Sequence, residues 1–306
     1  MIWWVLIGLV ALVVFGPFML DLTRPGMNRA AQASAPGAFA DLPKGRVHYQ
    51  WLGADEGPVA VCVHGLSTPS FVWGPVAEHL GGLGFRVLVF DLYGRGYSDR
   101  PRGEQDGAFF NAQLNALLEH QGVEDDITLL GYSMGGAIVA RYAAEHPDRL
   151  RQLCLIAPAG LGHDLGSIAD LITKYEWFGR WVTYAFFSKV LRQGIESERS
   201  TPAAIPDIYD MQTAETRRRG FAHAMWSSLR GVLDEDLEPA HRAIAKAGIP
   251  VLAIWGREDD VIPISGLGKL AEWNRAARHE VIEGAGHSLT YTCVEDVGKA
   301  LDLLKR

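Results

Sequence analysis

Apolar runs rich in β-branched residues alternate along the chain with stretches of helical periodicity. The apolar runs occupy residues 46–52, 59–63, 86–91, 127–131, 152–157, 250–255 and 279–282. Helical patterns fill several of the intervals, at residues 111–120, 136–146 and 266–277. Because strands that alternate with helices are joined by right-handed crossovers, this order predicts an α/β fold with a mostly parallel central sheet flanked by helices on both faces.

The alternation stops between residues 160 and 246, where helix-like segments follow one another without a clear strand. We interpret residues 160–246 as a helical cap inserted over the carboxyl edge of the sheet, where α/β proteins place their sites. The core is then expected in two parts, residues 46–159 and residues 247–306.

The first twenty residues carry no charged side chain. A helix of this length spans about 30 Å of hydrocarbon, and Trp3 and Trp4 suit the membrane interface. A cleaved signal peptide is the competing interpretation. However, no Lys or Arg precedes the apolar run, and the one A-x-A match, at residues 33–35, is followed by Pro36. Residues 1–20 are therefore predicted to be a transmembrane anchor.

Residues 21–45 are rich in Ala, Pro, Gly and polar side chains and show no sustained period, which favours a linker. The basic residues near the apolar run all follow it. They are Arg24, Arg29, Lys44 and Arg46. By the positive-inside rule, this asymmetry predicts that the globular part of the chain lies in the cytoplasm.

Charge and cysteine usage narrow the possible ligands. The net charge is -7 and the longest basic run is residues 217–219, so a nucleic-acid partner is not expected. The three cysteines, Cys62, Cys154 and Cys293, lack the spacing of a disulfide framework or a zinc site. No metal and no organic cofactor is implied.

One serine is flanked by glycines between an apolar run and a helical pattern. In "GYSMGG", Ser133 lies between Gly131 and Gly135, after the run at 127–131. A chance glycine-rich turn is one interpretation. The other is a nucleophile elbow, a strained strand-to-helix turn that only small neighbours permit and that presents the serine hydroxyl above the sheet.

Three more chemical landmarks follow apolar runs. "VAVCVHG" ends in His64 and Gly65, "WGREDD" ends in adjacent acidic residues, and "EGAGH" ends in His287. A serine, an acid and a histidine in this chain order, each just past a strand, are the parts of a base-activated nucleophile. The glycine-rich loop "DLYGRGYSD" contains Asp91, Arg95 and Ser98, which we expect to fix its conformation.

From residue 46 to the end, the chain resembles the α/β-hydrolase superfamily. The motifs that carry this resemblance are "HGLS", "DLYGRGYSDRP", "GYSMGG", "HPDRLRQLCLIAPAG", "WGREDDVIP" and "GAGH". It implies an α/β-hydrolase fold, in which the spacing from Gly256 to Pro263 selects Asp259 as the triad acid, with Asp260 as the alternative. The implied site residues are Ser133 as nucleophile, Asp259 as acid, His287 as base, and the backbone N–H groups of Leu66 and Met134 as oxyanion hole. His64 is interpreted as a structural brace of that turn, with direct catalysis as the alternative.

The resemblance also implies an activity. We expect a serine hydrolase that cleaves a lipophilic carboxylic ester, of carboxylesterase or lipase type, similar to N-terminally anchored monoacylglycerol lipases. Hydrolysis of a carbon–carbon bond and cofactor-free perhydrolysis are alternatives within the enzyme class. A non-catalytic, membrane-tethered binding module is an alternative outside it.

An aromatic stripe within the cap has two possible roles. The sequence "YEWFGRWVTYAFF" places Trp177, Trp181, Tyr184 and Phe187 at helical spacing, and Trp226 is a candidate for the facing side. The stripe either packs the cap onto the core or forms an apolar wall of the acyl pocket. For the second case, Trp177, Trp181, Tyr184 and Trp226 are the expected pocket residues.

Overall fold

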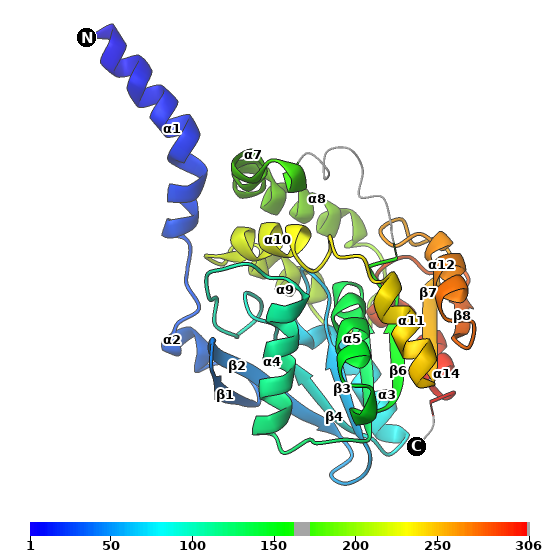
Figure 1. Ribbon diagram of the computed structural model, residues 1–306. Helices are drawn as coiled ribbons and strands as arrows, with labels where there is room; N and C mark the ends of the chain where they lie inside the picture. Colours follow the sequence, from blue (N-terminus) through cyan, green and yellow to red (C-terminus); the bar gives the residue numbers. More distant parts are fainter. Residues whose placement is uncertain (162–171, 305–306) are drawn as a thin grey trace.

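The computed structural model describes residues 1–161 and 172–304, and a single eight-stranded sheet runs through them in the order β1-β2-β4-β3-β5-β6-β7-β8 (Figure 1). Strands β3 to β8 pair in parallel, whereas β2 pairs antiparallel with both β1 and β4. The predicted α/β class and mostly parallel sheet are therefore confirmed. The strands are β1 (Ala38–Leu42), β2 (Gly45–Gly53), β3 (Val59–Val63), β4 (Arg86–Phe90), β5 (Ile127–Tyr132), β6 (Leu150–Ile156), β7 (Val251–Gly256) and β8 (Arg278–Ile282).

Helices cover both faces of the sheet, and each face has its own apolar core. One core joins α4 (Gly107–His120), α5 (Met134–Glu145), α11 (Glu238–Ala247) and α12 (Ser265–Trp273) to the strands. The other joins η1 (Ser70–Trp73), α3 (Gly74–Gly82), α13 (Leu289–Thr292) and α14 (Val294–Leu301). A short turn, η2 (Pro147–Arg149), leads from α5 into β6. Because helices lie on both faces, every residue of the central strand β5 is buried, which explains its continuous apolar run.

The segment predicted as an irregular linker, residues 21–45, contains regular structure. It includes α2 (Arg29–Gln32) and strand β1, which pairs with β2 through a tight hairpin. Only Ala40 of β1 is buried, and the strand contains no β-branched residue, so its pattern of apolar and polar positions was too weak to identify an edge strand.

Between β6 and β7, the described part of the chain is helical. The segments α7 (Glu176–Val182), η3 (Thr183–Phe187, a π-helical turn), α8 (Ser188–Glu198), α9 (Ile208–Glu215) and α10 (Phe221–Arg230) lie together at one end of the sheet (Figure 1). Helix α11, however, packs against α5 and α12 and belongs to the layer that covers the sheet. The helical cap therefore ends before Glu238 and not at residue 246.

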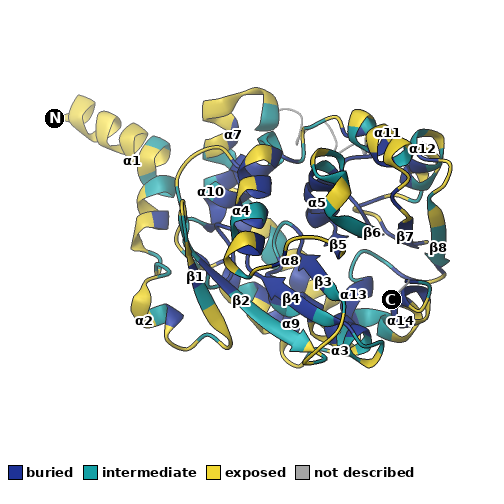
Figure 2. Cartoon of the chain, turned by 60° about the horizontal axis from the view of Figure 1, so that its bottom comes forward, coloured by how far each residue is buried: buried dark blue, intermediate teal, exposed yellow. Residues whose placement is uncertain are grey.

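The first helix, α1 (Ile2–Thr23), projects from the body and exposes its apolar side chains (Figures 1 and 2). It is 22 residues long and strongly apolar, so its length and composition suffice to cross a membrane. Its C-terminal half contacts the cap. The indole of Trp181 donates a hydrogen bond to the carbonyl of Val13 (3.0 Å), and the rings of Phe18 and Tyr184 lie 4.8 Å apart.

Candidate active site

Ser133 occupies the strained turn between β5 and α5. Its backbone has φ 54° and ψ -122°, a conformation that L-residues rarely adopt. The neighbouring glycines make this turn possible. A Cβ at Gly131 would collide with the carbonyl of Gly135, one at Gly135 would collide with the carbonyl of Val63, and one at Gly136 would come within 2.6 Å of Pro158. The three glycines thus let α5 start directly against β3 and β5.

The side chains of Ser133, His287 and Asp259 form a continuous hydrogen-bonded series. Ser133 Oγ lies 3.0 Å from His287 Nε2, and His287 Nδ1 lies 2.8 Å from Asp259 Oδ2. The other oxygen of Asp259 accepts the backbone N–H groups of Val261 (2.9 Å) and Ile262 (2.7 Å). The Asp259 side chain is 1% exposed. Of the two acids that the sequence left open, Asp259 is the one that bonds to His287, and Asp260 lines the cavity beside it.

These contacts define the state of the imidazole. With Asp259 accepting from Nδ1–H, Nε2 carries the lone pair and can accept the proton of Ser133. Tyr132 supports the ring. Its phenol donates to the backbone carbonyl of His287 (2.8 Å), and the two rings stack with centroids 5.3 Å apart. Sequence analysis missed Tyr132 in this role, although it directly precedes the serine in "GYSMGG".

The two predicted oxyanion donors lie on the turns that adjoin Ser133. Met134 is the first residue of the 12-residue helix α5, and the first N–H groups of a helix have no partner within it. Leu66 follows Gly65, which closely approaches Ser133: a Cβ at Gly65 would lie 3.1 Å from Ser133 Cβ. Both residues therefore lie next to Ser133, and their N–H groups stay the predicted oxyanion donors.

His64 braces this turn, as predicted from the sequence. Its Nε2 accepts the N–H of Leu92 (2.9 Å), so Nδ1 carries the proton and donates to the carbonyl of Gly65 (2.8 Å). The imidazole is fully buried, and burial lowers the pKa of His64 to about 4. The ring is thus neutral at pH 7 and connects the loops after β3 and β4.

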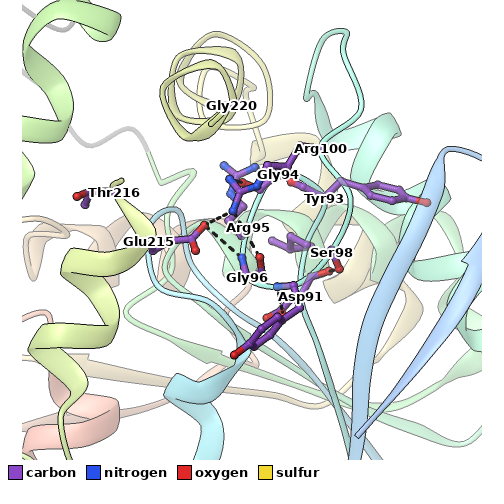
Figure 3. Close-up of polar contacts among 12 residues, drawn as sticks. Asp91, Tyr93, Gly94, Arg95, Gly96, Ser98, Arg100, Glu215, Thr216 and Gly220 are labelled. Carbon is purple, nitrogen blue, oxygen red and sulfur yellow. Dashed lines mark hydrogen bonds and ion pairs between the residues drawn. The ribbon is translucent and has the colours of Figure 1, made fainter. Parts of the chain in front are cut away.

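Arg95, on the loop after β4 (Figure 3), also bonds to this turn. This fully buried side chain donates from Nε to the carbonyl of Leu66 (3.0 Å) and from Nη2 to Ser228 Oγ (2.8 Å) on α10. Among the described residues it forms no ion pair, and burial lowers the pKa of Arg95 to about 9. Arg95 is therefore a positioning residue that connects the Leu66 turn to the cap.

Asp91 organises the glycine-rich loop after β4. Its carboxylate accepts the N–H groups of Ser70 (2.9 Å) and Tyr97 (2.9 Å) and a bond from His48 (2.8 Å), while Ser98 donates to its backbone carbonyl. Burial alone would raise the pKa of Asp91, but the bond and the charge of His48 outweigh burial and lower it to about 2. Asp91 and Ser98 fix the loop, as the sequence predicted.

Two buried histidines predict a loss of stability in mild acid. Burial lowers the pKa of both His64 and His241 from 6.5 to about 4. Between these values the unfolded chain binds more protons than the folded one, so the free energy of unfolding falls as pH decreases. The slope is up to about 1.4 kcal/mol per pH unit for each histidine.

The measurement is urea unfolding in neutral detergent from pH 7 to pH 5. His241→Phe is the control, because His241 stacks on Trp273 and neither ring nitrogen has a hydrogen-bond partner among the described residues. Replacing His241 should lower the slope of the free energy of unfolding against pH by up to about 1.4 kcal/mol per pH unit, the contribution of one proton. An unchanged slope in His241→Phe would contradict the assignment.

Ser133 and His287 open into a cavity of about 430 Å³ between the sheet and the cap. Its apolar lining includes Phe187 of the predicted aromatic stripe. The apolar residues are Leu66, Ala159, Phe187, Leu191, Ile195, Leu229, Leu233, Val261 and Ile262. We call this space the Ser133 cavity.

None of the four aromatic residues predicted for the acyl pocket lines this cavity. Trp177 is 58% exposed, Trp181 and Tyr184 contact α1, and Trp226 lines a different hollow of the surface. The stripe was placed wrongly because its partner, α1, is more than 150 residues away in the sequence, and helical spacing does not reveal what a face contacts.

A polar network lies beside His287, and sequence analysis did not find it. Ser288 donates to Glu198 (2.8 Å), Tyr291 donates to Ser288 (2.8 Å), and Gln212 Nε2 lies 3.2 Å from the Tyr291 hydroxyl. Gln212 Nε2 also donates to Thr68 (3.1 Å). All five residues line the Ser133 cavity. The described residues contain no cluster of His, Cys, Asp and Glu that could hold a metal ion.

Comparisons with known proteins agree with this geometry. A profile of the family described as alpha/beta hydrolase fold matches residues 58–292. A 2-hydroxy-6-oxo-6-phenylhexa-2,4-dienoate hydrolase of Comamonas testosteroni is 25% identical over 301 residues, which are 94% of this chain and 100% of the relative. Lipase 3 of a Moraxella species is 25% identical over 251 residues, 78% of this chain and 75% of the relative.

Among solved structures, an esterase from Exiguobacterium antarcticum superposes with a TM-score of 0.71 at 22% identity. The superposition covers 87% of this chain and 98% of the esterase. At this identity the likeness concerns the fold, while the family profile covers most of the chain and includes the turns that carry Ser133 and His287. The chain belongs to the alpha/beta-hydrolase superfamily.

Proposed function

We propose that the protein is a serine hydrolase that cleaves a lipophilic carboxylic ester through an acyl-enzyme on Ser133. The observation that carries the proposal is the series from Ser133 Oγ to His287 (3.0 Å) and from His287 to Asp259 (2.8 Å). The intact series favours an enzyme over a binding module, because a binding module does not need an activated hydroxyl.

The mechanism assigns one role to each group. His287 Nε2 accepts the proton of Ser133 as Oγ bonds to the ester carbonyl carbon, and Asp259 stabilises the imidazolium. The N–H groups of Leu66 and Met134 hold the tetrahedral oxyanion. The ester carbon–oxygen bond then breaks, and His287 gives its proton to the leaving alcohol. Water repeats the sequence and releases the carboxylic acid.

The apolar part of the Ser133 cavity suits an acyl chain. Leu66, Phe187, Leu191 and Leu229 bring aliphatic and aromatic surface from both the core and the cap. Burying each methylene of a bound chain is worth about 0.8 kcal/mol. A volume of about 430 Å³ holds a chain of medium length together with a small alcohol.

The polar network suits the alcohol portion. The leaving oxygen takes its proton from His287, so the alcohol departs beside Ser288, Tyr291 and Glu198. Glu198 is an exposed carboxylate that can accept hydroxyl groups. We therefore infer an alcohol with free hydroxyls, as in a monoacylglycerol.

The surface next to α1 supports a membrane location. Besides α1, the described residues expose few large apolar side chains, and most of those lie on one part of the cap. This exposed cap patch consists of Tyr175, Trp177, Phe178, Phe186 and Val190, which are 43–62% exposed. An apolar helix and an apolar patch side by side are the features of a surface that contacts lipid. In this proposal α1 is a retained anchor, and the basic residues after it place the catalytic domain in the cytoplasm.

Hydrolysis of a carbon–carbon bond is the second candidate. The Comamonas relative, which this chain matches over its full length, is named for that reaction. The apolar lining, the exposed cap patch and α1 favour lipid esters instead.

The test is turnover of p-nitrophenyl esters from C2 to C16 by the full-length protein in neutral detergent. We expect kcat/KM to peak at a chain of medium length, because the cavity volume is about 430 Å³. If no ester is turned over while Ser133 still reacts with a fluorophosphonate, the ester proposal fails. A ring-fission product should then be the substrate.

A second arm tests the alcohol portion. For Glu198→Ala, kcat/KM for a monoacylglycerol should fall about tenfold relative to the methyl ester of the same acid, because a charge-assisted hydrogen bond is lost. Glu196→Ala is the matched control. Glu196 lies on the same helix but pairs with Arg199 and does not line the cavity. If the ratio of kcat/KM for the monoacylglycerol to kcat/KM for the methyl ester were the same in both variants, Glu198 would not bind the alcohol portion.

A further inference from the structure

A second cavity, of about 1030 Å³, lies at the base of α1. Its walls are the last turns of α1, the loop after β4 and the start of α10. It shares no described lining residue with the Ser133 cavity, and α10 separates the two: Ala224 faces the second cavity and Leu229 the first. We call it the basic cavity.

Cations outnumber carboxylates around this cavity. It is lined by five basic residues, Lys44, Arg100, Arg102, Arg180 and Arg219, and by two acidic ones, Asp21 and Asp99. Both carboxylates accept backbone N–H groups, Asp21 from Gly220 (3.1 Å) and Asp99 from Arg46 (2.8 Å).

Four of the five cations have no carboxylate partner. Arg100 pairs with Glu215 at 2.7 Å (Figure 3). Lys44, Arg102, Arg180 and Arg219 form no ion pair with any described residue. The cavity therefore offers an excess of positive charge to a ligand.

Two buried donor atoms belong to residues that line the same space, although the atoms themselves lie behind its surface. Gln105 is 1% exposed, and its Oε1 accepts from Arg95 and Ser228, which fixes the amide with Nε2 on the opposite side. Among the residues that the structure describes, neither Gln105 Nε2 nor Arg100 Nε has a hydrogen-bond partner. The loop backbone packs closely here, since a Cβ at Gly94 would come within 2.7 Å of Ala224 Cβ and 3.1 Å of Gln105 Nε2. The excess of cations on the cavity lining is what calls for an anionic ligand.

We propose that the basic cavity binds the phosphate-bearing headgroup of an anionic lipid. Phe18, Leu22 and Tyr184 supply an apolar side for the glycerol and the first methylenes. The N-terminus of α10, at Phe221, adds a partial positive charge.

The position of the cavity on α1 identifies a lipid as the source of the phosphate. This step depends on α1 being the membrane anchor of the proposed function. A 22-residue helix spans about 33 Å, close to the hydrocarbon thickness of a bilayer. Phe18, Asp21 and Leu22 belong to its last two turns, so the cavity lies at the depth of lipid phosphates.

The test is thermal unfolding of full-length Ser133→Ala in neutral detergent, a variant that cannot hydrolyse the probe by the proposed mechanism. Dihexanoyl phosphatidic acid should raise Tm by about 3 °C at ten times its Kd. Dihexanoyl phosphatidylcholine and inorganic phosphate at the same concentration should raise it by less than 1 °C by the same relation.

Paired variants localise the effect. Arg180→Gln with Arg219→Gln removes two exposed cations of the cavity and should abolish the shift. Arg242→Gln with Arg275→Gln removes two exposed arginines outside it and should keep the shift. Equal shifts in both pairs, or an equal effect of inorganic phosphate, would overturn the lipid site. This experiment measures binding and not turnover. If the wild-type protein cleaves esters but the lipid does not raise Tm, the lipid site is wrong and the proposed esterase function still stands.

Discussion

Replacement of Ser133 by alanine is expected to lower kcat for ester hydrolysis by roughly 10⁶-fold, because the acyl-enzyme can no longer form. The variant should fold normally. The backbone at φ 54° stays as it is, and only one hydroxyl, bonded to His287 at 3.0 Å, is lost. The measurement is initial-rate turnover of the best p-nitrophenyl ester, together with fluorophosphonate labelling of the same preparations.

Ser197→Ala is the matched control for this prediction. Ser197 lines the same cavity, but its hydroxyl donates to the carbonyl of Gly194 and does not contact His287. Its kcat should stay within about threefold of the wild-type value, since a single neutral hydrogen bond contributes about 1 kcal/mol at most here. Residual turnover above 1% in Ser133→Ala, with labelling retained, would place the nucleophile elsewhere.

The sequence predicted the three side chains that the structure joins by hydrogen bonds because each of them is fixed by a local pattern. Ser133 is identified by glycines that must be small to let α5 approach β3, and His287 by its place just after a strand. The choice of Asp259 over Asp260 required the spacing of the superfamily. In the structure, the two backbone N–H groups that hold Asp259 Oδ1 account for that spacing.

The substrate-facing surroundings were harder to predict because they are assembled from distant elements. Glu198 lies on α8, Gln212 on α9 and Tyr291 on α13, so no local period joins them. The basic cavity likewise combines α1, the loop after β4 and α10. Strand β1 was missed for another reason, since an edge strand with a single buried residue has little apolar alternation.

The hydrogen bonds of Asp259 predict a second large loss of activity, in the Asp259→Asn variant. Asp259→Asn is expected to lower kcat by about 10⁴-fold. Asp259 Oδ1 accepts the N–H groups of Val261 and Ile262, so the asparagine must keep its carbonyl oxygen there and direct its NH₂ toward His287. His287 Nδ1 then accepts, the ring proton moves to Nε2, and the imidazole can no longer take the proton of Ser133.

The comparison with Asp260→Asn makes this prediction specific. Asp260 lines the Ser133 cavity, but Asp259 is the carboxylate hydrogen-bonded to His287, at 2.8 Å. The kcat of Asp260→Asn should therefore change by less than about fivefold. Fluorophosphonate should label Asp260→Asn rapidly and Asp259→Asn slowly. If Asp260→Asn lost activity as severely as Asp259→Asn, the imidazole would be oriented by a different carboxylate during turnover. The wrong tautomer of His287 would then not explain the lower kcat of Asp259→Asn.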